Sequence, residues 1–475
     1  MYKRQKMKLL IGMVLLFALL CQGCSHSVGQ NAGSTQDTSE TTSTQPTESV
    51  ETEEVTEEPT EEVDEIERLA SVAPQIGTIK ITSSWIGDEY VDAVVSIDGI
   101  DGISEAVSEM SMRIKQRGNT SKYHPKKSYN MKFEDKISLF GLDSGKKWSL
   151  LAMASDKALL RTPIAFLYAQ AIGVAYTSQF YLTELWLNDE YKGVYLLIEP
   201  VQEGKNRVDI DLEMGDFLIE CNLLREEEGI SYITTNQGMR FEINEPEEPT
   251  EEQKSVYITW LNEAEAAIVS MDHNQYQNYI DVESFVKYYI FEEITKNIDF
   301  GRFSTRYYCK DGKLYAGPPW DMDLTLGNVS SSHWEPIYHE YNNNGGYGNG
   351  SNDSTEGIWA DKQNWYKWLC QDEYFMNLVK QRWTELLPVT MNLVQENEWG
   401  VSRMDYFLNA YTDQLVRNYQ SKEEGGAGWQ IGAEALGIEY NYKFSDYAES
   451  VEHLRQWLLD RILWLDTQYN TAVSE

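Results

Sequence analysis

Residues 297–323 read NIDFGRFSTRYYCKDGKLYAGPPWDMD, which joins a loop acid, a hairpin and a pair of further acids. Ahead of this stretch, apolar residues recur at the spacing of one helix face, and Asp281 stands at the position of a helix cap. The spacing predicts a helix over 281–296. Asp299 then lies in a loop just beyond a buried helix end.

The middle of the stretch predicts a β-hairpin that leads to the two further acids. Asp311 and Gly312 separate two strand-like runs, and this dipeptide is a strong signal for a two-residue hairpin turn. The chain then reaches Asp321 and Asp323, whose side chains point to the same face if the segment is extended.

In kinases, a loop aspartate, a hairpin and a metal-binding aspartate follow one another in this order. In that layout Asp299 orients or deprotonates the acceptor hydroxyl, while Asp321 or Asp323 binds magnesium. An Asp-x-Asp pair also holds the metal of a nucleotide-sugar in glycosyltransferases. The pattern favours phosphoryl transfer. It indicates binding of a metal ion and phosphate more firmly than it indicates one particular reaction.

A basic turn supplies candidate partners for phosphate oxygens. Arg117 is followed by Gly-Asn-Thr-Ser, and Lys126, Lys127 and Lys132 come shortly after. An arginine or lysine here could clamp a triphosphate. Taken alone, the run fits an ordinary polar hairpin with solvated lysines better.

The N-terminus has the features of an export signal over residues 1–24. Four basic residues precede an apolar run of 12 residues, from Leu9 to Leu20. A membrane span needs about 20 apolar residues, so this run is too short. The following Cys-Gln-Gly-Cys resembles a bacterial lipoprotein cleavage site with Cys24 as the lipidated residue. The alternative is a plain cleaved signal peptide.

Residues 25–72 are predicted to form an acidic, disordered tether. The part from 25 to 67 contains 13 Asp or Glu and no Lys or Arg, so it has too little apolar surface to fold. A lipid anchor followed by such a tether predicts an exported protein on the outer face of a bacterial cytoplasmic membrane.

Charge and cysteine content exclude some classes of protein. The formal net charge is −36, which argues against nucleic acid as a partner because phosphate backbones require a basic surface. Cys221, Cys309 and Cys370 lie beyond the tether at unpaired spacings. A disulfide framework or a zinc cluster is therefore not expected.

Residues 73–475 are predicted to form one α+β domain with a β-rich half over 73–249 and a helical half over 250–475. Strand-like alternation dominates the first half. The second half has helical patterns, which contain five tryptophans assigned to core packing. Helices are predicted over 251–270, 281–296, 363–387, 403–419 and 446–469, besides one that starts at Thr162 as N-cap. A Gly-, Asn- and Ser-rich loop over 327–361 follows the acid pair.

A β-rich half followed by a helical half, with acids near the junction, is the two-lobe plan of a protein kinase. The usual G-x-G-x-x-G, H-R-D and D-F-G signatures are absent from the sequence.

The chain resembles the spore coat protein H family, called CotH, of atypical secreted protein kinases. The resemblance covers about 110–330 and rests on several segments in the family's order. These segments are Arg117-Gly-Asn-Thr-Ser, Lys126-Lys-Ser-Tyr-Asn-Met-Lys-Phe, Lys147-Trp-Ser-Leu-Leu-Ala, Ser155-Asp-Lys-Ala-Leu-Leu-Arg, Leu187 to Glu199, Gly204-Lys-Asn-Arg-Val, Asn297-Ile-Asp and Pro319-Trp-Asp-Met-Asp.

The resemblance implies a divergent two-lobe kinase-like fold that uses ATP with Mg²⁺ or Mn²⁺ to phosphorylate Ser or Thr. By this analogy Asp299 takes the catalytic role and Asp321 the metal role. The strand that ends at Glu199 corresponds to the hinge beside adenine, with phosphates near Arg117. Lys127 or Lys132 corresponds to the phosphate-binding lysine, and the regular strand pattern favours Lys132.

The expected partner is a secreted or surface protein substrate, or the chain itself, because the leader and tether indicate a surface location. A spore-coat role does not follow from them. The alternative is a surface scaffold or binding module that keeps the fold without catalysis. A metal-dependent glycosyltransferase is the weaker alternative.

Overall fold

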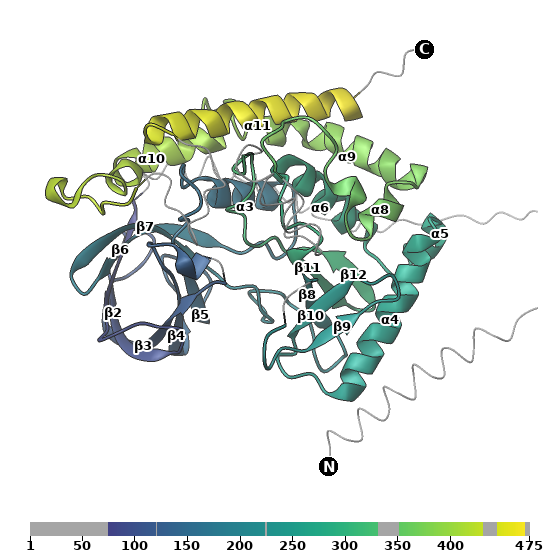
Figure 1. Cartoon of the computed structure of the whole chain (residues 1–475), viewed down its shortest axis with the longest axis horizontal. Helices are drawn as coiled ribbons and strands as arrows, with labels where there is room; N and C mark the ends of the chain where they lie inside the picture. Colours follow the sequence, from purple (N-terminus) through teal and green to yellow (C-terminus); the bar gives the residue numbers. More distant parts are fainter. Residues whose placement is uncertain (1–74, 120, 224–225, 331–350, 431–443, 471–475) are drawn as a thin grey trace, which may run out of the picture. The chain divides into compact units, whose positions relative to one another are not determined.

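The computed structural model describes residues 75–119, 121–223, 226–330, 351–430 and 444–470 (Figure 1). The signal peptide predicted for 1–24 and the tether predicted for 25–72 lie outside these residues. All of the described residues belong to one compact unit. None of the helices in the described ranges is both long and apolar enough to cross a membrane.

Seven strands close into a barrel in the order β1-β2-β3-β4-β5-β7-β6. The ring is completed by a parallel pairing of β1 with β6, while the other neighbours are antiparallel. The strands are β1 (Gly77–Thr82), β2 (Val91–Ile97), β3 (Val107–Arg117), β4 (Ser128–Ile137), β5 (Gly145–Leu151), β6 (Phe180–Leu187) and β7 (Glu190–Ile198).

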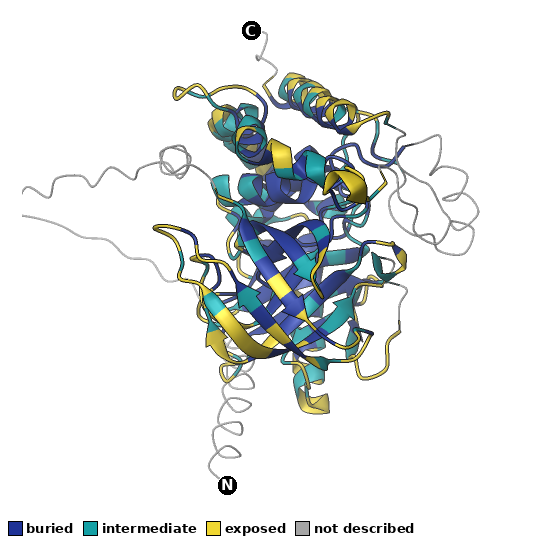
Figure 2. Ribbon diagram, turned by 90° about the vertical axis from the view of Figure 1, so that its left-hand side faces the viewer, coloured by how far each residue is buried: buried dark blue, intermediate teal, exposed yellow. Residues whose placement is uncertain are grey.

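Alternation of apolar and polar residues explains why these strands form a barrel with a packed interior. On β3, Met112 and Ile114 are buried inside, and on β4, Met131 and Phe133 are buried beside them. Residues between them, such as Lys132, point outward because successive side chains on a strand face opposite sides. Figure 2 shows the resulting mixture of buried and exposed positions along the strands.

A second sheet has the order β12-β11-β8-β10-β9, and helices flank it (Figure 1). Its strands are β8 (Phe217–Asn222), β9 (Tyr232–Thr234), β10 (Arg240–Glu245), β11 (Phe303–Lys310) and β12 (Lys313–Ala316). The α-helices are α3 (Arg161–Ala171), α4 (Glu251–Val269), α5 (His273–Tyr276), α6 (Val282–Thr295), α8 (Tyr366–Leu369), α9 (Glu373–Met391), α10 (Arg403–Arg417) and α11 (Tyr447–Tyr469). Three short 3₁₀ turns are η1 (Ser121–Tyr123), η2 (Ala360–Lys362) and η3 (Lys422–Glu424).

The α+β class, with a β-rich first half and a helical later part, is confirmed. The hairpin predicted at Asp311-Gly312 is also present, and both residues have positive φ (52° and 76°), as a tight two-residue turn between twisted strands requires. This hairpin joins β8 in one sheet, so strands from both sides of the predicted division at 249 lie together.

Two helix boundaries differ from the prediction. The helix predicted over 363–387 is interrupted, because Asp372 accepts a hydrogen bond from the backbone N–H of Tyr374 and starts a new helix there. The helix expected to begin with Thr162 as its cap begins at Arg161 instead, where Asp156 accepts from the backbone N–H of Arg161.

The predicted role of the tryptophans in core packing is confirmed. Trp365 and Trp383 are fully buried, and Trp457 is nearly so. Trp368 and Trp464 are partly buried against the same core. This core also includes the apolar face of α6, which ends at the candidate site.

A fully buried ion pair joins α6 to α11. Arg461 Nη2 lies 2.7 Å from Glu293 Oε2, and neither side chain is exposed to solvent. Arg461 also donates to the carbonyl oxygens of Thr355 and Gly357, while Glu293 accepts from the backbone N–H of Ala360. The pair therefore holds the described end of the long Gly/Asn loop against two helices.

We expect Arg461→Met to lower the free energy of unfolding by about 3–5 kcal/mol, because it leaves the Glu293 carboxylate buried without its partner. Urea denaturation would measure the change. The exposed pair of Lys80 and Asp98 provides the control, since Lys80→Met should cost less than about 1 kcal/mol. Equal losses in the two variants would contradict this account.

Candidate active site

Asp299 is held in a tight turn directly after α6. The helix ends at Lys296, which has a left-handed backbone (φ 45°). The side-chain oxygen of Asn297 accepts from the backbone N–H of Asp299 at 3.0 Å. The carbonyl oxygen of Asp299 accepts from the N–H groups of Arg302 and Phe303. These bonds fix the backbone of Asp299, which is a half-buried residue.

Asp321 and Asp323 follow β12, as the hairpin predicts. Asp321 is exposed and has a left-handed backbone (φ 60°), a conformation that aspartate and asparagine tolerate better than most residues. Ser304, at the start of β11, donates a long hydrogen bond of 3.5 Å to Asp321. Met322 between the two acids is buried in the core, which anchors the segment.

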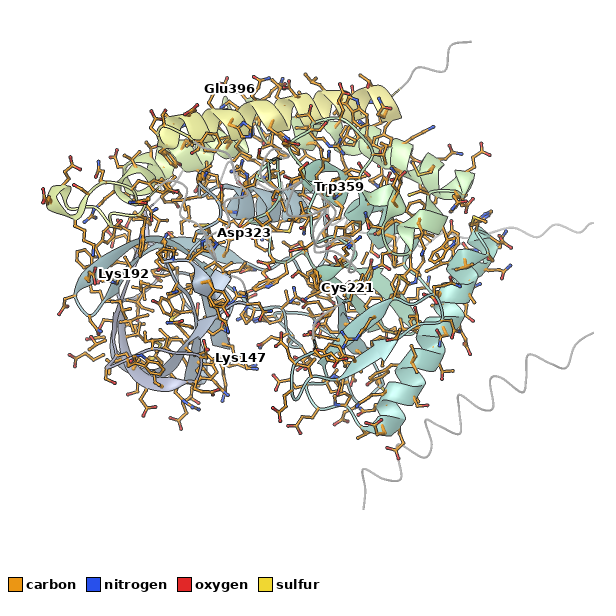
Figure 3. All side chains as sticks on the ribbon, viewed as in Figure 1. Lys147, Lys192, Cys221, Asp323, Trp359 and Glu396 are labelled. Carbon is orange, nitrogen blue, oxygen red and sulfur yellow. The ribbon has the colours of Figure 1, made fainter. Side chains whose placement is uncertain are left out.

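The three acids share one electrostatic environment. Burial raises the pKa of Asp323 above its usual value, and the nearby charges of Asp321 and Asp299 raise it further. A hydrogen bond from the Ser155 side chain opposes these effects on the pKa. Figure 3 shows Asp323 where the barrel meets the helices. Asp299, Asp321 and Asp323, which the sequence predicts to act together, therefore lie close enough for Asp299 and Asp321 to affect the charge of Asp323.

This arrangement fits a divalent cation. Carboxylates that repel one another in a partly buried site are stabilised when a cation lies between them. Across the described ranges, no three His, Cys, Asp or Glu side chains form a ready-made metal cluster. Mg²⁺ is commonly held by one or two carboxylates together with water and substrate phosphates, so Asp321 and Asp323 would be sufficient ligands from the chain.

Two arginines lie beside the acids and share one aromatic ring. The guanidinium carbons of Arg117 and Arg306 are 5.3 and 5.2 Å from the centre of the Trp320 ring. Burial lowers the pKa of Arg117, and the charge of Asp321 opposes this shift. Arg306 forms an ion pair of 2.5 Å with Glu220, while its Nε and Nη1 atoms are buried without a hydrogen-bond partner among the described residues. The Arg306 guanidinium therefore keeps hydrogen-bonding capacity for an anion beside Arg117.

A cavity of about 170 Å³ opens next to this pair of arginines. One wall comes from barrel strands, and another comes from the linker that follows β7. The lining residues are Tyr90, Arg117, Asn130, Lys147, Trp148, Ser149, Pro200, Val201, Arg306 and Trp320. The cavity joins three cationic side chains to a partly aromatic surface.

A family model described as CotH kinase protein matches residues 114–465, which is most of the chain. The chain belongs to the CotH kinase family. No curated protein matches it.

The remaining residues predicted for the site of this CotH-family chain lie elsewhere. The Lys127 ammonium donates to the carbonyl oxygen of Lys122 at 2.6 Å. Lys132 is exposed on the outer face of the barrel and does not line the cavity. The Glu199 carboxylate is buried in an ion pair with Arg207, in a different cavity. Their nucleotide-binding roles stay predictions.

Sequence reasoning about this CotH-family chain did not single out Arg306, Lys147 or Trp320 as site residues. Lys147 lies on β5 beside Lys132 and reaches the cavity, where it also pairs with Glu247. Arg306 lies in the predicted hairpin. Strand alternation in the sequence could have shown which face of its strand Arg306 and Lys147 each occupy. That both line one cavity with Trp320 and the linker depends on how the two sheets pack.

A hydrogen-bonded chain links the basic turn of the CotH-family site to Asp323. His124 Nε2 lies 3.0 Å from the Ser155 hydroxyl, and that side chain in turn hydrogen-bonds Asp323. Burial lowers the pKa of His124 to about 4, so its imidazole is neutral at neutral pH. Ser155 is therefore oriented from one side by the imidazole and aimed at a candidate metal ligand.

We expect Ser155→Ala to weaken Mn²⁺ binding by about tenfold or more, because residues that orient a metal ligand commonly contribute this much. Titration of the full chain with Mn²⁺, followed by electron paramagnetic resonance, would measure the affinity. Ser270→Ala is the matched control, since that hydroxyl hydrogen-bonds the backbone of Ala267 and Asp272 between α4 and α5. Unchanged Mn²⁺ affinity in Ser155→Ala would exclude Asp323 as a ligand oriented by Ser155.

Proposed function

We propose that the chain transfers the γ-phosphoryl group of ATP to a serine or threonine hydroxyl of a protein outside the cytoplasm. The observation that carries this proposal is that Asp299, Asp321 and Asp323 affect one another's charge beside Arg117, which lines one cavity together with Arg306. Phosphoryl transfer needs little besides positioned cations and a carboxylate for the acceptor, and these groups supply both.

The order of elements around the cavity supports a kinase-like arrangement. A strand (β5), a helix (α3) and a hairpin (β6–β7) lead into the linker at Pro200, and the β11–β12 hairpin separates Asp299 from Asp321. Kinases place their phosphate-binding lysine on the strand before the corresponding helix. By this fold-level analogy, Lys147 is a better candidate for that role than Lys127 or Lys132.

The chain's own groups divide the work of the reaction. Arg117 and Arg306 bind phosphate oxygens and offset negative charge, and Lys147 adds a third cation at the opening of the cavity. Asp299 accepts the proton of the acceptor hydroxyl as the oxygen bonds to the γ-phosphorus and the bond to the leaving ADP oxygen breaks. A Mg²⁺ or Mn²⁺ ion held by Asp321 and Asp323 would neutralise charge on the phosphates.

The location of the substrate is proposed from the leader and tether. A lipidated Cys24 and an acidic tether over 25–72 would carry the folded unit on the outer face of a bacterial cytoplasmic membrane. The substrate would then be a secreted or surface protein, or the chain itself.

Transfer of labelled phosphate from ATP by the full chain, with Mg²⁺ or Mn²⁺, tests the reaction. We expect label on the chain or on casein, and a loss of at least about 100-fold in Asp321→Asn and Asp299→Asn. Asparagine keeps the left-handed backbone of position 321, so the first variant removes a charge without straining the turn. Asp98→Asn, at an exposed ion pair, is the control.

The outcomes of this assay separate the candidate functions. ATP binding without transfer in the unmodified chain would favour a scaffold. Absence of ATP binding together with binding of a nucleotide-sugar would favour a glycosyltransferase. Full activity in Asp321→Asn would remove that residue from the metal site.

We expect Arg306→Met to raise the KM for ATP by about 10–100-fold, because a charge-assisted hydrogen bond to phosphate contributes about 1.5–3 kcal/mol. Steady-state kinetics would measure it. Arg382→Met is the matched control, since Arg382 lies on α9, where it pairs with Glu283 and Glu385. Equal KM values in both variants would place the phosphates away from Arg306.

A further inference from the structure

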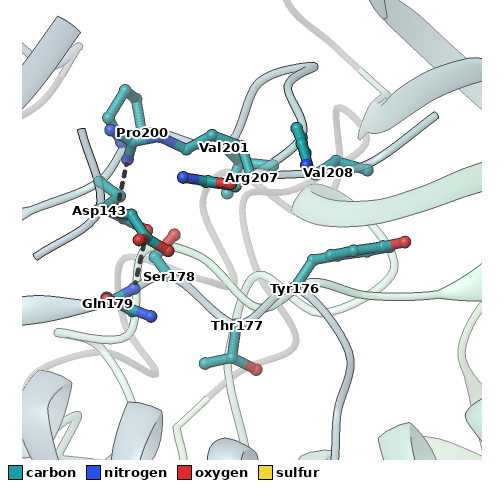
Figure 4. A pocket seen from close by; sticks show the side chains of 12 residues that line it. Asp143, Tyr176, Thr177, Ser178, Gln179, Pro200, Val201, Arg207 and Val208 are labelled. Atoms are coloured by element: carbon teal, nitrogen blue, oxygen red, sulfur yellow. Dashed lines mark hydrogen bonds and ion pairs between the residues drawn. The ribbon is translucent and has the colours of Figure 1, made fainter. Parts of the chain in front are cut away.

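A second and larger cavity, of about 340 Å³, lies against the same linker. It is bordered by the loop before β6 (176–179), the linker (199–201), the turn that follows it (205–208) and Asp143 (Figure 4). Pro200 and Val201 line both cavities. No charged side chain in the described ranges lines both cavities, so the second one is a separate site. Its volume is within the range of small-molecule pockets.

A buried ion pair in the wall of this cavity has unused hydrogen-bonding capacity. Arg207 Nη1 lies 3.3 Å from Glu199 Oε1, and both side chains are more than nine-tenths buried. Among the described residues, neither terminal nitrogen of Arg207 has a hydrogen-bond partner, and neither does Glu199 Oε1. Glu199 Oε2 accepts from the backbone N–H of Gln179 at 3.3 Å. Unsatisfied buried groups are costly, so a ligand that pairs with them gains affinity.

The surroundings hold these two groups in place. The Arg207 guanidinium carbon lies 5.0 Å from the centre of the Trp148 ring. A methyl group on Gly145 would come within 2.1 Å of Arg207 Nη2, so a glycine is needed for the guanidinium to lie against β5. Tyr176, which also lines the cavity, has a left-handed backbone (φ 58°), which is unusual for an aromatic residue. Backbone strain of this kind persists where the surrounding structure enforces it, often at ligand sites.

The positive and negative charges in the lining are equal in number. Arg207 and Lys205 provide two cations, while Glu199 and Asp143 provide two carboxylates. A ligand with a single charge would leave half of these groups unmatched. A compact zwitterion can place a carboxylate on the guanidinium and an ammonium on the carboxylates.

We propose that this cavity is a binding site for a free α-amino acid. The carboxylate of the ligand accepts from the terminal nitrogens of Arg207, and its ammonium donates to Glu199 Oε1. The proposal does not depend on the phosphotransferase function, because none of the charged side chains of this site lines the cavity beside Arg117 and Arg306.

Calorimetric titration of the full chain with each of the twenty standard amino acids, up to about 10 mM, tests the proposal; this concentration would reveal even a Kd of about 1 mM. We expect saturable binding of at least one of them. Arg207→Met should weaken it by about tenfold or more, because the ligand carboxylate loses a charge-assisted partner. Arg382→Met, on α9, should leave it unchanged.

Two further variants keep the test decisive if Arg207→Met fails to fold. Asn206→Trp fills the cavity from its exposed rim without touching the buried pair, and Gly145→Ala displaces the guanidinium. Both should abolish or weaken binding, whereas Asp321→Asn should retain it even if it abolishes phosphate transfer. Absence of binding by every amino acid would overturn the proposal. Equal binding of acetate, or binding unaffected by Asn206→Trp, would also overturn it.

Discussion

The buried pair of Glu293 and Arg461 is the interaction on which the candidate active site depends most. Two charges without solvent exposure must remain together, since separating them in a low-dielectric interior is very costly. This requirement sets the position of the last turn of α6 relative to α11. The next residues along the chain are those of the turn that carries Asp299. A constraint in the core thus fixes the position of the turn that carries Asp299, the candidate catalytic residue.

The same constraint organises the end of the long Gly/Asn loop. Around the ion pair, Lys296 donates to the carbonyl oxygens of Ser354 and Glu356, and the Trp359 indole donates to the carbonyl oxygen of Asn297. The fully buried Asn352 donates to the carbonyl oxygens of Lys296 and Leu324. The described end of the loop is therefore hydrogen-bonded to residues next to Asp299 and Asp323. On the opposite side, Arg161 pairs with Asp156 and also donates to Leu326, so a second buried pair secures the segment after Asp323.

Local patterns in the sequence were sufficient to predict the helix before Asp299, the hairpin after it, and Asp321 and Asp323 beyond the hairpin. Each depends on residues close together in the chain. Closure of the barrel could not be predicted this way, because β1 pairs with β6 about a hundred residues later. The same limitation applies to Arg306 and Lys147, whose common cavity depends on the contact between two sheets. The position of Glu199 at the end of a strand could be predicted from the sequence. Its ion pair with Arg207 could not.

Barrel closure also bears on how the folded chain resists aggregation. A closed ring pairs the backbone of every strand with two neighbours, so these seven strands offer no open edge to another chain. In the second sheet the outer positions belong to β9 and β12, which have three and four residues. Edges this short give a neighbouring molecule little backbone to pair with. Among the strands that the structure describes, long ones are interior and short ones are peripheral, an arrangement that permits crowding without β-sheet polymerisation.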